Sequence, residues 1–342
     1  MPYKGEKTIT TIKDVSKLAN VSVASVSKVL NGNYKGVSES TKERILQAAK
    51  KLKYRPNRIA RGLVKNETAI IGLVVPDISN PYYSDIIKGA EEAASLNGYN
   101  VILCNTDEDA KKEKRHINML LEYNCSGVII CGMQSPDNMI VLDEYEIPVI
   151  TLDGEGDSGI SFNSNSQRGA FLAIQYLVQM GHQKIAFIGG ENGEDKLCPR
   201  YSGFISALKR LNLEQDNALY RSGCYDIETG YGFASDLLKE KRDFTAIFCG
   251  NDLIAFGAMK AVRESGLSVP GDISLIGYDD IVLSSFFEPK LTTIRQDASR
   301  IGKDMVATLL DSFENENPYR TVYYAEPTLI VRDSVRDINE KL

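Results

Sequence analysis

Several features that would indicate an enzyme, a metalloprotein or a disulfide-rich protein are scarce in this sequence. The chain has two histidines, His116 and His182, and neither stands at metal-ligand spacing to another histidine or to a cysteine. Six cysteines are scattered without a C-x-x-C pair, so we expect buried free thiols. No Ser-His-Asp triad, paired-acid arrangement or phosphate-binding loop emerges. The sequence therefore predicts no catalytic residues, no metal, no cofactor and no enzymatic activity.

Long apolar runs are also missing. No window approaches the roughly 18 consecutive apolar residues that cross a bilayer. The first seven residues lack the apolar core of a secretory signal. We therefore expect a cytoplasmic protein without a membrane partner. The hydrophobic content of 43% and the charged content of 25% are those of a soluble globular protein, and 342 residues are enough for two or three cores.

Charge is distributed unevenly along the chain. Residues 1–65 contain 15 lysines and arginines against 4 acidic residues, a net charge of +11, whereas the remainder contains 25 basic and 42 acidic residues, a net charge of −17. A basic module on an acidic body is suited to binding DNA phosphates at one end only. Charge alone is equally compatible with a solvated, lysine-rich surface.

The basic region has the pattern of a small helical bundle. Apolar residues recur at helical spacing from Ile12 to Ala19 and again from Val26 to Leu30. Between them, Asn20 can adopt the left-handed conformation of a tight turn and Ser22 can cap the second helix. A third helix is predicted after Ser38, with Ile45, Leu46, Ala49 and Leu52 facing inward, and it should end before Pro56.

From Ala69 onward, apolar strands alternate with amphipathic segments of helix length. Strands are predicted at 70–75, 99–104, 127–131, 148–152, 184–189, 246–249 and 274–277. Helices are predicted at 82–97, 110–123, 168–180, 201–211, 228–239 and 253–264. The fold class expected is an all-α helix-turn-helix headpiece followed by an α/β domain of two doubly wound parallel-sheet lobes.

The segment from Thr11 to Gly32, TIKDVSKLANVSVASVSKVLNG, closely resembles the headpiece of the lactose/galactose repressor family. The exposed face of its second helix presents small side chains, hydroxyls and one cation, which suits a major groove. The resemblance implies base contacts by Val23, Ala24 and Lys28 and phosphate contacts by Ser22, Ser25 and Asn31. Thr11 and Ser27 complete this part of the DNA-binding set. Lys28 stands where arginine is more usual, and lysine cannot form the planar bidentate pair with guanine.

The segment from Arg55 to Leu63 resembles the hinge helix of the same family, whose paired copies enter the minor groove. The resemblance implies that Leu63 wedges into a base step and that nearby arginines are attracted to the negative groove. A plain linker is the alternative. The DNA-binding residues implied here are Asn57, Arg58, Ala60, Arg61 and Leu63.

The larger domain resembles the sensor domain of this family and the periplasmic sugar-binding proteins that share its fold. Its matching polar and aromatic residues fall after strands or at crossings between the lobes, where ligands bind to such sheets. Each residue taken singly could equally be a helix cap, a turn former or a core aromatic. The effector-binding set implied is Asn80, Tyr82, Tyr83, Asp153, Arg200, Tyr225, Asn251, Asp279 and Gln296.

Two carboxylates, one guanidinium and two amides between aromatic walls suit a neutral polyol, and a phosphosugar would require more cations. Asp153 is followed by Gly154 where ribose-type binders often carry arginine, which leaves pentose recognition open. The function expected is a transcriptional regulator, a repressor, controlled by a small effector that is a neutral sugar. The alternatives are a catabolite-control regulator whose effector is a phosphorylated carrier protein and a sugar-binding receptor without a role on DNA.

The resemblance further implies a homodimer on a pseudo-palindromic operator, with one headpiece on each half-site. The tail after Val331 lacks sustained heptads, which argues against a tetramerising coiled coil. The domain boundaries expected are 1–56 for the headpiece and 57–68 for the hinge and linker. The N-terminal lobe should comprise 69–164 with 297–322, and the C-terminal lobe 165–296 with 323–342.

Overall fold

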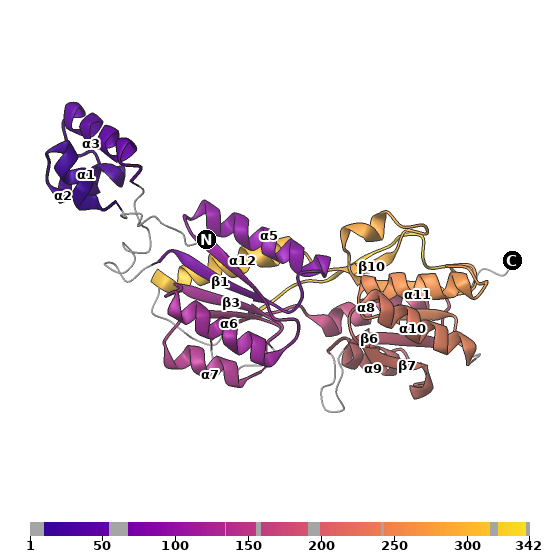
Figure 1. The fold of residues 1–342 in the computed structure, drawn as a ribbon. Coiled ribbons are helices and arrows are strands. Elements are labelled where there is room, and N and C mark those ends of the chain that lie inside the picture. The colour runs from indigo at the N-terminus through magenta and orange to yellow at the C-terminus, as the bar shows by residue number, and fades with distance from the viewer. Residues whose placement is uncertain are drawn as a thin grey trace, which may run out of the picture. The chain divides into compact units, whose positions relative to one another are not determined.

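The computed structural model describes residues 10–54, 68–133, 135–154, 159–190, 199–240, 243–314 and 321–339. The chain divides into two compact units, one ending at Thr68 and the other beginning at Ala69. The first unit contains three helices in its described part (Figure 1), and the second contains two six-stranded sheets.

The headpiece consists of α1 (Ile12–Ala19), α2 (Val23–Leu30) and α3 (Glu39–Lys51). The turn between the first two helices follows the predicted chemistry: Asn20 is left-handed at φ 50°, and the Ser22 hydroxyl accepts a hydrogen bond from Ser25 N at 3.1 Å. Asp14 strengthens the start of α1 by accepting a hydrogen bond from Thr11 N at 2.8 Å. The core consists of Val15, Ala19, Val26, Val29, Ile45, Ala48 and Ala49.

One prediction for the headpiece core is wrong. Leu46 is 43% exposed, whereas Ile45 is completely buried. Residues three and four apart share a helix face, so the inward face of α3 continues from Ile45 to Ala48 and Ala49. Leu46 is rotated by about 100° from Ile45 and falls outside that face.

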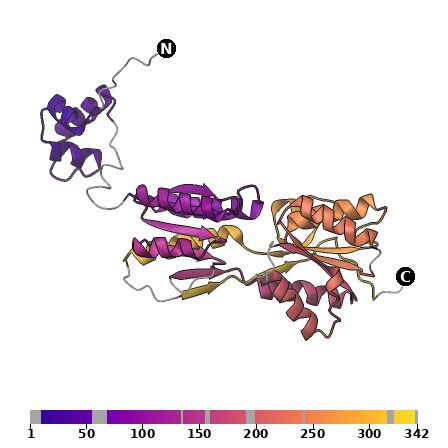
Figure 2. The ribbon, with the colours of Figure 1, turned by 60° about the horizontal axis from the view of Figure 1, so that its bottom comes forward.

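The N-terminal lobe has a parallel sheet in the order β11-β5-β4-β3-β1-β2. Helices cover both faces of the sheet (Figure 2), with α5 and α12 packed on one face and α6 and α7 on the other. The strands are β1 (Ile70–Val75), β2 (Asn100–Asn105), β3 (Gly127–Cys131), β4 (Val149–Leu152), β5 (Ile160–Asn163) and β11 (Thr321–Tyr324). The helices are α5 (Pro81–Leu96), α6 (Ala110–Glu122), α7 (Asp137–Glu144) and α12 (Ala298–Glu314).

The C-terminal lobe repeats this plan with the sheet order β12-β10-β9-β8-β6-β7, in which only the β12–β10 pair is antiparallel. Helices α8 and α9 cover one face, and α10 and α11 cover the other. The strands are β6 (Ile185–Gly190), β7 (Tyr220–Gly223), β8 (Ala246–Cys249), β9 (Ser274–Asp279), β10 (Thr292–Arg295) and β12 (Thr328–Ile330). The helices are α8 (Ser166–Gln179), α9 (Pro199–Arg210), α10 (Ile227–Lys239) and α11 (Asp252–Glu264), with short 3-10 turns at Asn217–Leu219 and Val282–Ser285.

The expected fold class is thus confirmed, but one lobe boundary is not. Strand β11 pairs with β5 in the first sheet through the register Thr321↔Ile160 to Tyr324↔Asn163. The chain therefore returns to the C-terminal lobe after Tyr324, whereas the sequence placed the return after residue 322. The physical reason is that β11 is a short edge strand with mostly exposed side chains, so it has no buried apolar run to mark its end.

No strand was predicted for β5, β7, β10, β11 and β12. Strand β10 is largely buried but only four residues long, and the other four are short and only partly buried. Four of the five cysteines in the described segments are buried, and Cys224 is exposed. Cys198 lies outside these segments. No helix in the described part of the chain combines the length and apolar character needed to span a membrane.

Candidate nucleic-acid interface and ligand pocket

Helix α2 presents the side chains that the sequence assigned to DNA. Val23, Ala24 and Lys28 are exposed, whereas Val26 and Val29 are buried in the headpiece core. Ser22, Asn31 and Thr11 are also exposed, and Ser25 and Ser27 are half-buried. Because Val23 and Ala24 are small, a partner could approach the helix backbone closely on this face.

Most polar groups on this face have partners within the headpiece. Lys28 Nζ donates to the carbonyl of Lys35 at 2.6 Å, so the ammonium lies against the loop between α2 and α3. Asn31 Nδ2 donates to Ser27 Oγ at 3.3 Å. The Thr11 hydroxyl donates to Asp14 at 2.8 Å. The hinge residues Asn57, Arg58, Ala60, Arg61 and Leu63 lie outside the described segments.

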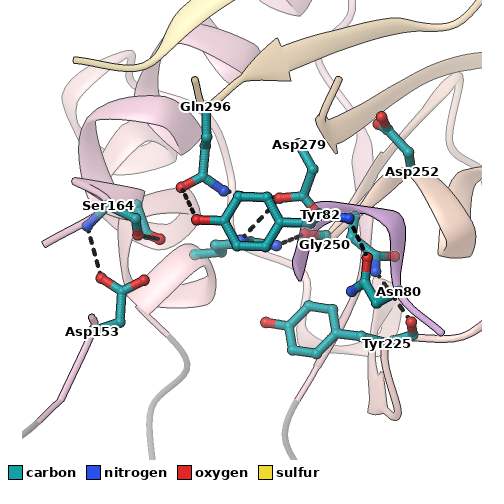
Figure 3. Close-up of polar contacts among 12 residues, drawn as sticks. Asn80, Tyr82, Asp153, Ser164, Tyr225, Gly250, Asp252, Asp279 and Gln296 are labelled. Carbon is teal, nitrogen blue, oxygen red and sulfur yellow. Dashed lines mark hydrogen bonds and ion pairs between the residues drawn. The ribbon is translucent and has the colours of Figure 1, made fainter. Parts of the chain in front are cut away.

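In the larger unit, a chain of hydrogen bonds joins the two lobes. The Tyr82 hydroxyl, on α5 of the N-terminal lobe, donates to Gln296 Oε1 at 3.4 Å. Gln296 Nε2 donates to Asp279 Oδ1 at 2.8 Å, at the end of β9. Arg200 completes the chain, with NH2 at 3.2 Å from the same carboxylate oxygen. Figure 3 shows the Tyr82 ring beside Gln296 and Asp279. The side chains of Tyr82, Asp279 and Gln296 are almost fully buried.

Arg200 is held by aromatic rings as well as by charge. Its guanidinium lies 4.0 Å from the centre of the Tyr278 ring and 5.4 Å from that of Tyr225. Its NH1 also donates to the carbonyl of Gly250. The Tyr225 ring lies so close to the ends of β6 and β8 that a side chain at Gly190 would overlap it. Glycine is therefore needed at position 190 if the Tyr225 ring is to lie here, on one side of the candidate pocket.

Two of the predicted pocket residues are helix caps. Asn80 Oδ1 accepts from Tyr82 N at 3.0 Å and begins α5. Asn251 Oδ1 accepts from Ile254 N at 2.8 Å and begins α11, while its Nδ2 donates to the carbonyl of Tyr225 at 3.1 Å. These amides fix the backbone at Tyr82 and Tyr225, whose aromatic rings belong to the candidate pocket.

The remaining predicted residues lie on the N-terminal lobe. Asp153 follows β4, is exposed, and accepts from Ser164 N at 2.7 Å where the chain crosses between the lobes. Tyr83 is half-buried and packs edge-to-face against Tyr82, with ring centres 5.3 Å apart. Sequence reasoning missed Gly250, Tyr278 and Asp252. Each of them is next in sequence to a predicted residue, and this proximity is the one feature of the sequence that could have indicated them.

Burial changes the acid–base behaviour of the pocket. It raises the pKa of Asp279 to about 6, although the positive charge of Arg200 opposes the shift. Burial and the negative charge of Asp279 raise the pKa of Asp252 to about 7. Burial also raises the pKa of Tyr82, Tyr83 and Tyr278, so their hydroxyls stay protonated at neutral pH.

Asp252→Asn is expected to remove a pH-dependent part of the stability. The carboxyl ionises at its ordinary pKa of 3.8 in the unfolded chain and near 7 in the folded protein. Between these values the folded state binds a proton that the unfolded state has lost, so this contribution to stability falls by a few kcal/mol as the pH rises. Denaturant unfolding from about pH 4 to about pH 8 should therefore show a steeper loss of stability for the wild type than for the variant, which keeps only the contribution of other groups such as Asp279. Asp304→Asn, in an exposed ion pair, is the control. Parallel curves for wild type and Asp252→Asn would contradict the assignment.

The sequence matches two family profiles. Residues 11–57 match bacterial regulatory proteins of the lacI family, and residues 68–323 match the periplasmic binding proteins and sugar binding domain of the LacI family. A curated relative is the HTH-type transcriptional repressor PurR of Pasteurella multocida (strain Pm70). It is 36% identical over 332 residues, which cover 96% of this chain and 99% of that protein.

Solved structures agree with the profiles. The Lac repressor dimer bound to operator and the anti-inducer ONPF has a TM-score of 0.86 and 29% identity, covering 96% of this chain and 99% of that chain. The transcriptional regulator CelR in its cellobiose complex has a TM-score of 0.71 and 28% identity, covering 95% and 99%. The matches span both the headpiece and the larger unit. The chain therefore belongs to the LacI family and is a DNA-binding transcriptional repressor.

Proposed function

We propose that this repressor binds a pseudo-palindromic operator as a homodimer and is controlled by a neutral sugar held between its two lobes. The observation that carries the proposal is the hydrogen-bonded chain from Tyr82 through Gln296 and Asp279 to Arg200. It joins the lobes at the carboxyl ends of their sheets, where ligands bind in this architecture. A ligand that replaces these bonds would change how the lobes are held together.

The proposed DNA face is the exposed side of α2, with Val23, Ala24 and Lys28 toward the bases. Phosphate contacts are assigned to Ser22, Ser25 and Asn31, and Thr11 and Ser27 border the same face. Because Lys28 lies against the carbonyl of Lys35 and lacks the fork of arginine, we expect weaker discrimination of guanine at this position. The hinge residues 57, 58, 60, 61 and 63 and the domain boundaries stated above belong to the same proposal, with the final return to the C-terminal lobe placed after Tyr324.

The chemistry of the pocket favours an uncharged ligand. The proposed ligand set contains two carboxylates, Asp153 and Asp279, and one guanidinium, and Arg200 already pairs with Asp279. A phosphorylated sugar would therefore meet an excess of negative charge. The rings of Tyr82, Tyr83 and Tyr225 offer apolar surfaces for the C–H faces of a sugar. The cellobiose in the CelR structure and the family description as a sugar binding domain support this class of ligand.

The proposed dimer contact includes an apolar patch on the C-terminal lobe, made of Val282, Leu283, Phe286 and Phe287. Val282 is 64% exposed and Phe286 is 75% exposed. Phe287 is stacked on Phe256 of α11, with ring centres 4.3 Å apart. Exposed apolar side chains that cluster in this way are typical of an association surface. We assign a second copy of the chain as the partner because the Lac repressor neighbour is described as a dimer on its operator.

A ligand panel tests the effector assignment. An operator is first selected from random duplex DNA with the full-length protein. Thermal unfolding and gel shifts are then measured with neutral mono- and disaccharides, sugar phosphates and nucleobases. We expect one neutral sugar to raise the melting temperature and to change operator affinity at least tenfold, since these effects are linked. Stabilisation only by a sugar phosphate or a nucleobase would overturn the neutral-sugar assignment and leave the DNA assignment standing.

A further inference from the structure

The apolar patch is held outward by two buried residues of its own segment, one before the patch and one within it. Ile281 and Ser284 are buried, at 3% and 0% exposure, whereas Val282 and Phe286 on the same short segment are exposed. Ser284 N donates to the carbonyl of Ile281 at 2.9 Å, and the carbonyl of Ser284 accepts from Leu291 N at 2.8 Å. The segment is therefore attached to the lobe from its inner side.

A buried carboxylate adds two further bonds to that attachment. Asp252 Oδ2 accepts from the backbone N of Ile281 at 2.9 Å and from the Ser284 hydroxyl at 2.7 Å. The Asp252 side chain is completely buried, so these bonds are not shared with solvent. Both bonds hold residues that flank the outward Val282 and Leu283.

The other oxygen of Asp252 is bound to a different element. Oδ1 accepts from the Thr293 hydroxyl on β10 at 2.5 Å. The carboxylate also lies so close to Gly277 of β9 that any side chain at this position would overlap Oδ1. As the first residue of α11, Asp252 lies at a helix N-terminus, which favours its negative charge. One carboxylate thus connects α11, β10 and the patch segment.

We propose that Asp252 is a positioning residue for the dimer contact, holding the apolar patch in the shape that a second copy of the chain recognises. This inference rests on the proposed homodimer. Asn251, the preceding residue, holds the carbonyl of Tyr225 in the ligand pocket. Adjacent residues at the start of one helix therefore fix a pocket wall and the patch, which gives the pocket a direct structural connection to the dimer surface.

The test compares two hydroxyl groups that bind the two different oxygens of the same carboxylate. Ser284→Ala removes the bond to the patch segment, and Thr293→Val removes the bond to β10 with little change in side-chain volume. Dimer dissociation constants are measured by sedimentation equilibrium on the full chain, together with thermal unfolding. We expect Asp252→Asn to weaken dimerisation tenfold or more and Ser284→Ala fivefold or more. Thr293→Val should lower the melting temperature and keep the dimer constant within twofold of wild type.

The outcomes separate this inference from the proposal beneath it. Phe286→Ser tests the patch itself and should weaken the dimer at least tenfold. If Phe286→Ser does so while Asp252→Asn and Ser284→Ala dimerise as wild type does, Asp252 is only a structural residue and the inference fails. Equal weakening by Ser284→Ala and Thr293→Val would also overturn it, since a general loss of stability would then be the cause. A wild-type protein that is monomeric at all concentrations would overturn the proposed homodimer.

Discussion

Replacement of Arg200 by methionine is expected to lower the free energy of unfolding by about 3 kcal/mol and to abolish the response to the effector. The side chains of Arg200 and Asp279 are 13% and 3% exposed, so the variant leaves a buried carboxylate without its cation. Methionine keeps much of the packing on Tyr278. The lower free energy of unfolding would therefore be due to lost charge and hydrogen bonding and not to a cavity. Denaturant unfolding measures the stability, and gel shifts with the sugar identified by the panel measure the response.

The pH dependence provides an internal check on the Arg200 variant. The positive charge of Arg200 lowers the pKa of Asp279, so without it this pKa rises above its wild-type value of about 6. At low pH Asp279 is protonated in both proteins, and the difference in stability should shrink. Arg300→Met breaks an exposed ion pair and serves as the control, with little expected change in stability because solvent screens the pair. An Arg200 deficit that stays constant from about pH 4 to about pH 8 would contradict the charge argument.

Gly230→Ala is expected to destabilise the C-terminal lobe by about 3 kcal/mol, whereas Gly232→Ala on the same helix should be neutral or gain up to about 1 kcal/mol. A methyl group at Gly230 would overlap the backbone carbonyl of Ile254, because α10 and α11 pack closely at this point. A methyl group at Gly232 meets nothing within 4 Å. For Gly232→Ala, the only expected effect on stability is therefore the gain in helix propensity.

The two glycine variants are compared by denaturant unfolding under identical conditions. They differ by two positions on one helix and carry the same chemical change, so any effect of propensity is common to both. The difference between them therefore measures the helix–helix contact. Equal stabilities would mean that α10 and α11 can separate without a penalty, which the close approach at Gly230 argues against.

The sequence predicted the order and type of most elements because their signals are local. Buried parallel strands appear as short apolar runs, and the helices of both lobes keep an apolar face. The headpiece turn was readable from Asn20 and Ser22, whose conformations depend on neighbouring residues. Short edge strands such as β11 were missed, since their pairing depends on a partner far away in the chain.

The candidate pocket required the tertiary structure. Tyr82 and Gln296 are 214 positions apart, and no local pattern indicates that their side chains meet. Asn80 and Asn251 carry the residue type expected of a pocket, yet their side-chain amides cap helices and position the neighbouring tyrosines. Asp252 gave no signal of its own, because its partners come from segments 29 to 41 residues away.

The sequence by itself determined that the chain has a basic three-helix headpiece and an α/β body of two lobes, since periodicity, capping and charge are properties of neighbouring residues. Only the tertiary structure decided which polar side chains face one another. That choice depends on where the strands of each sheet end and on which donors reach a buried carboxylate, and both follow from long-range packing.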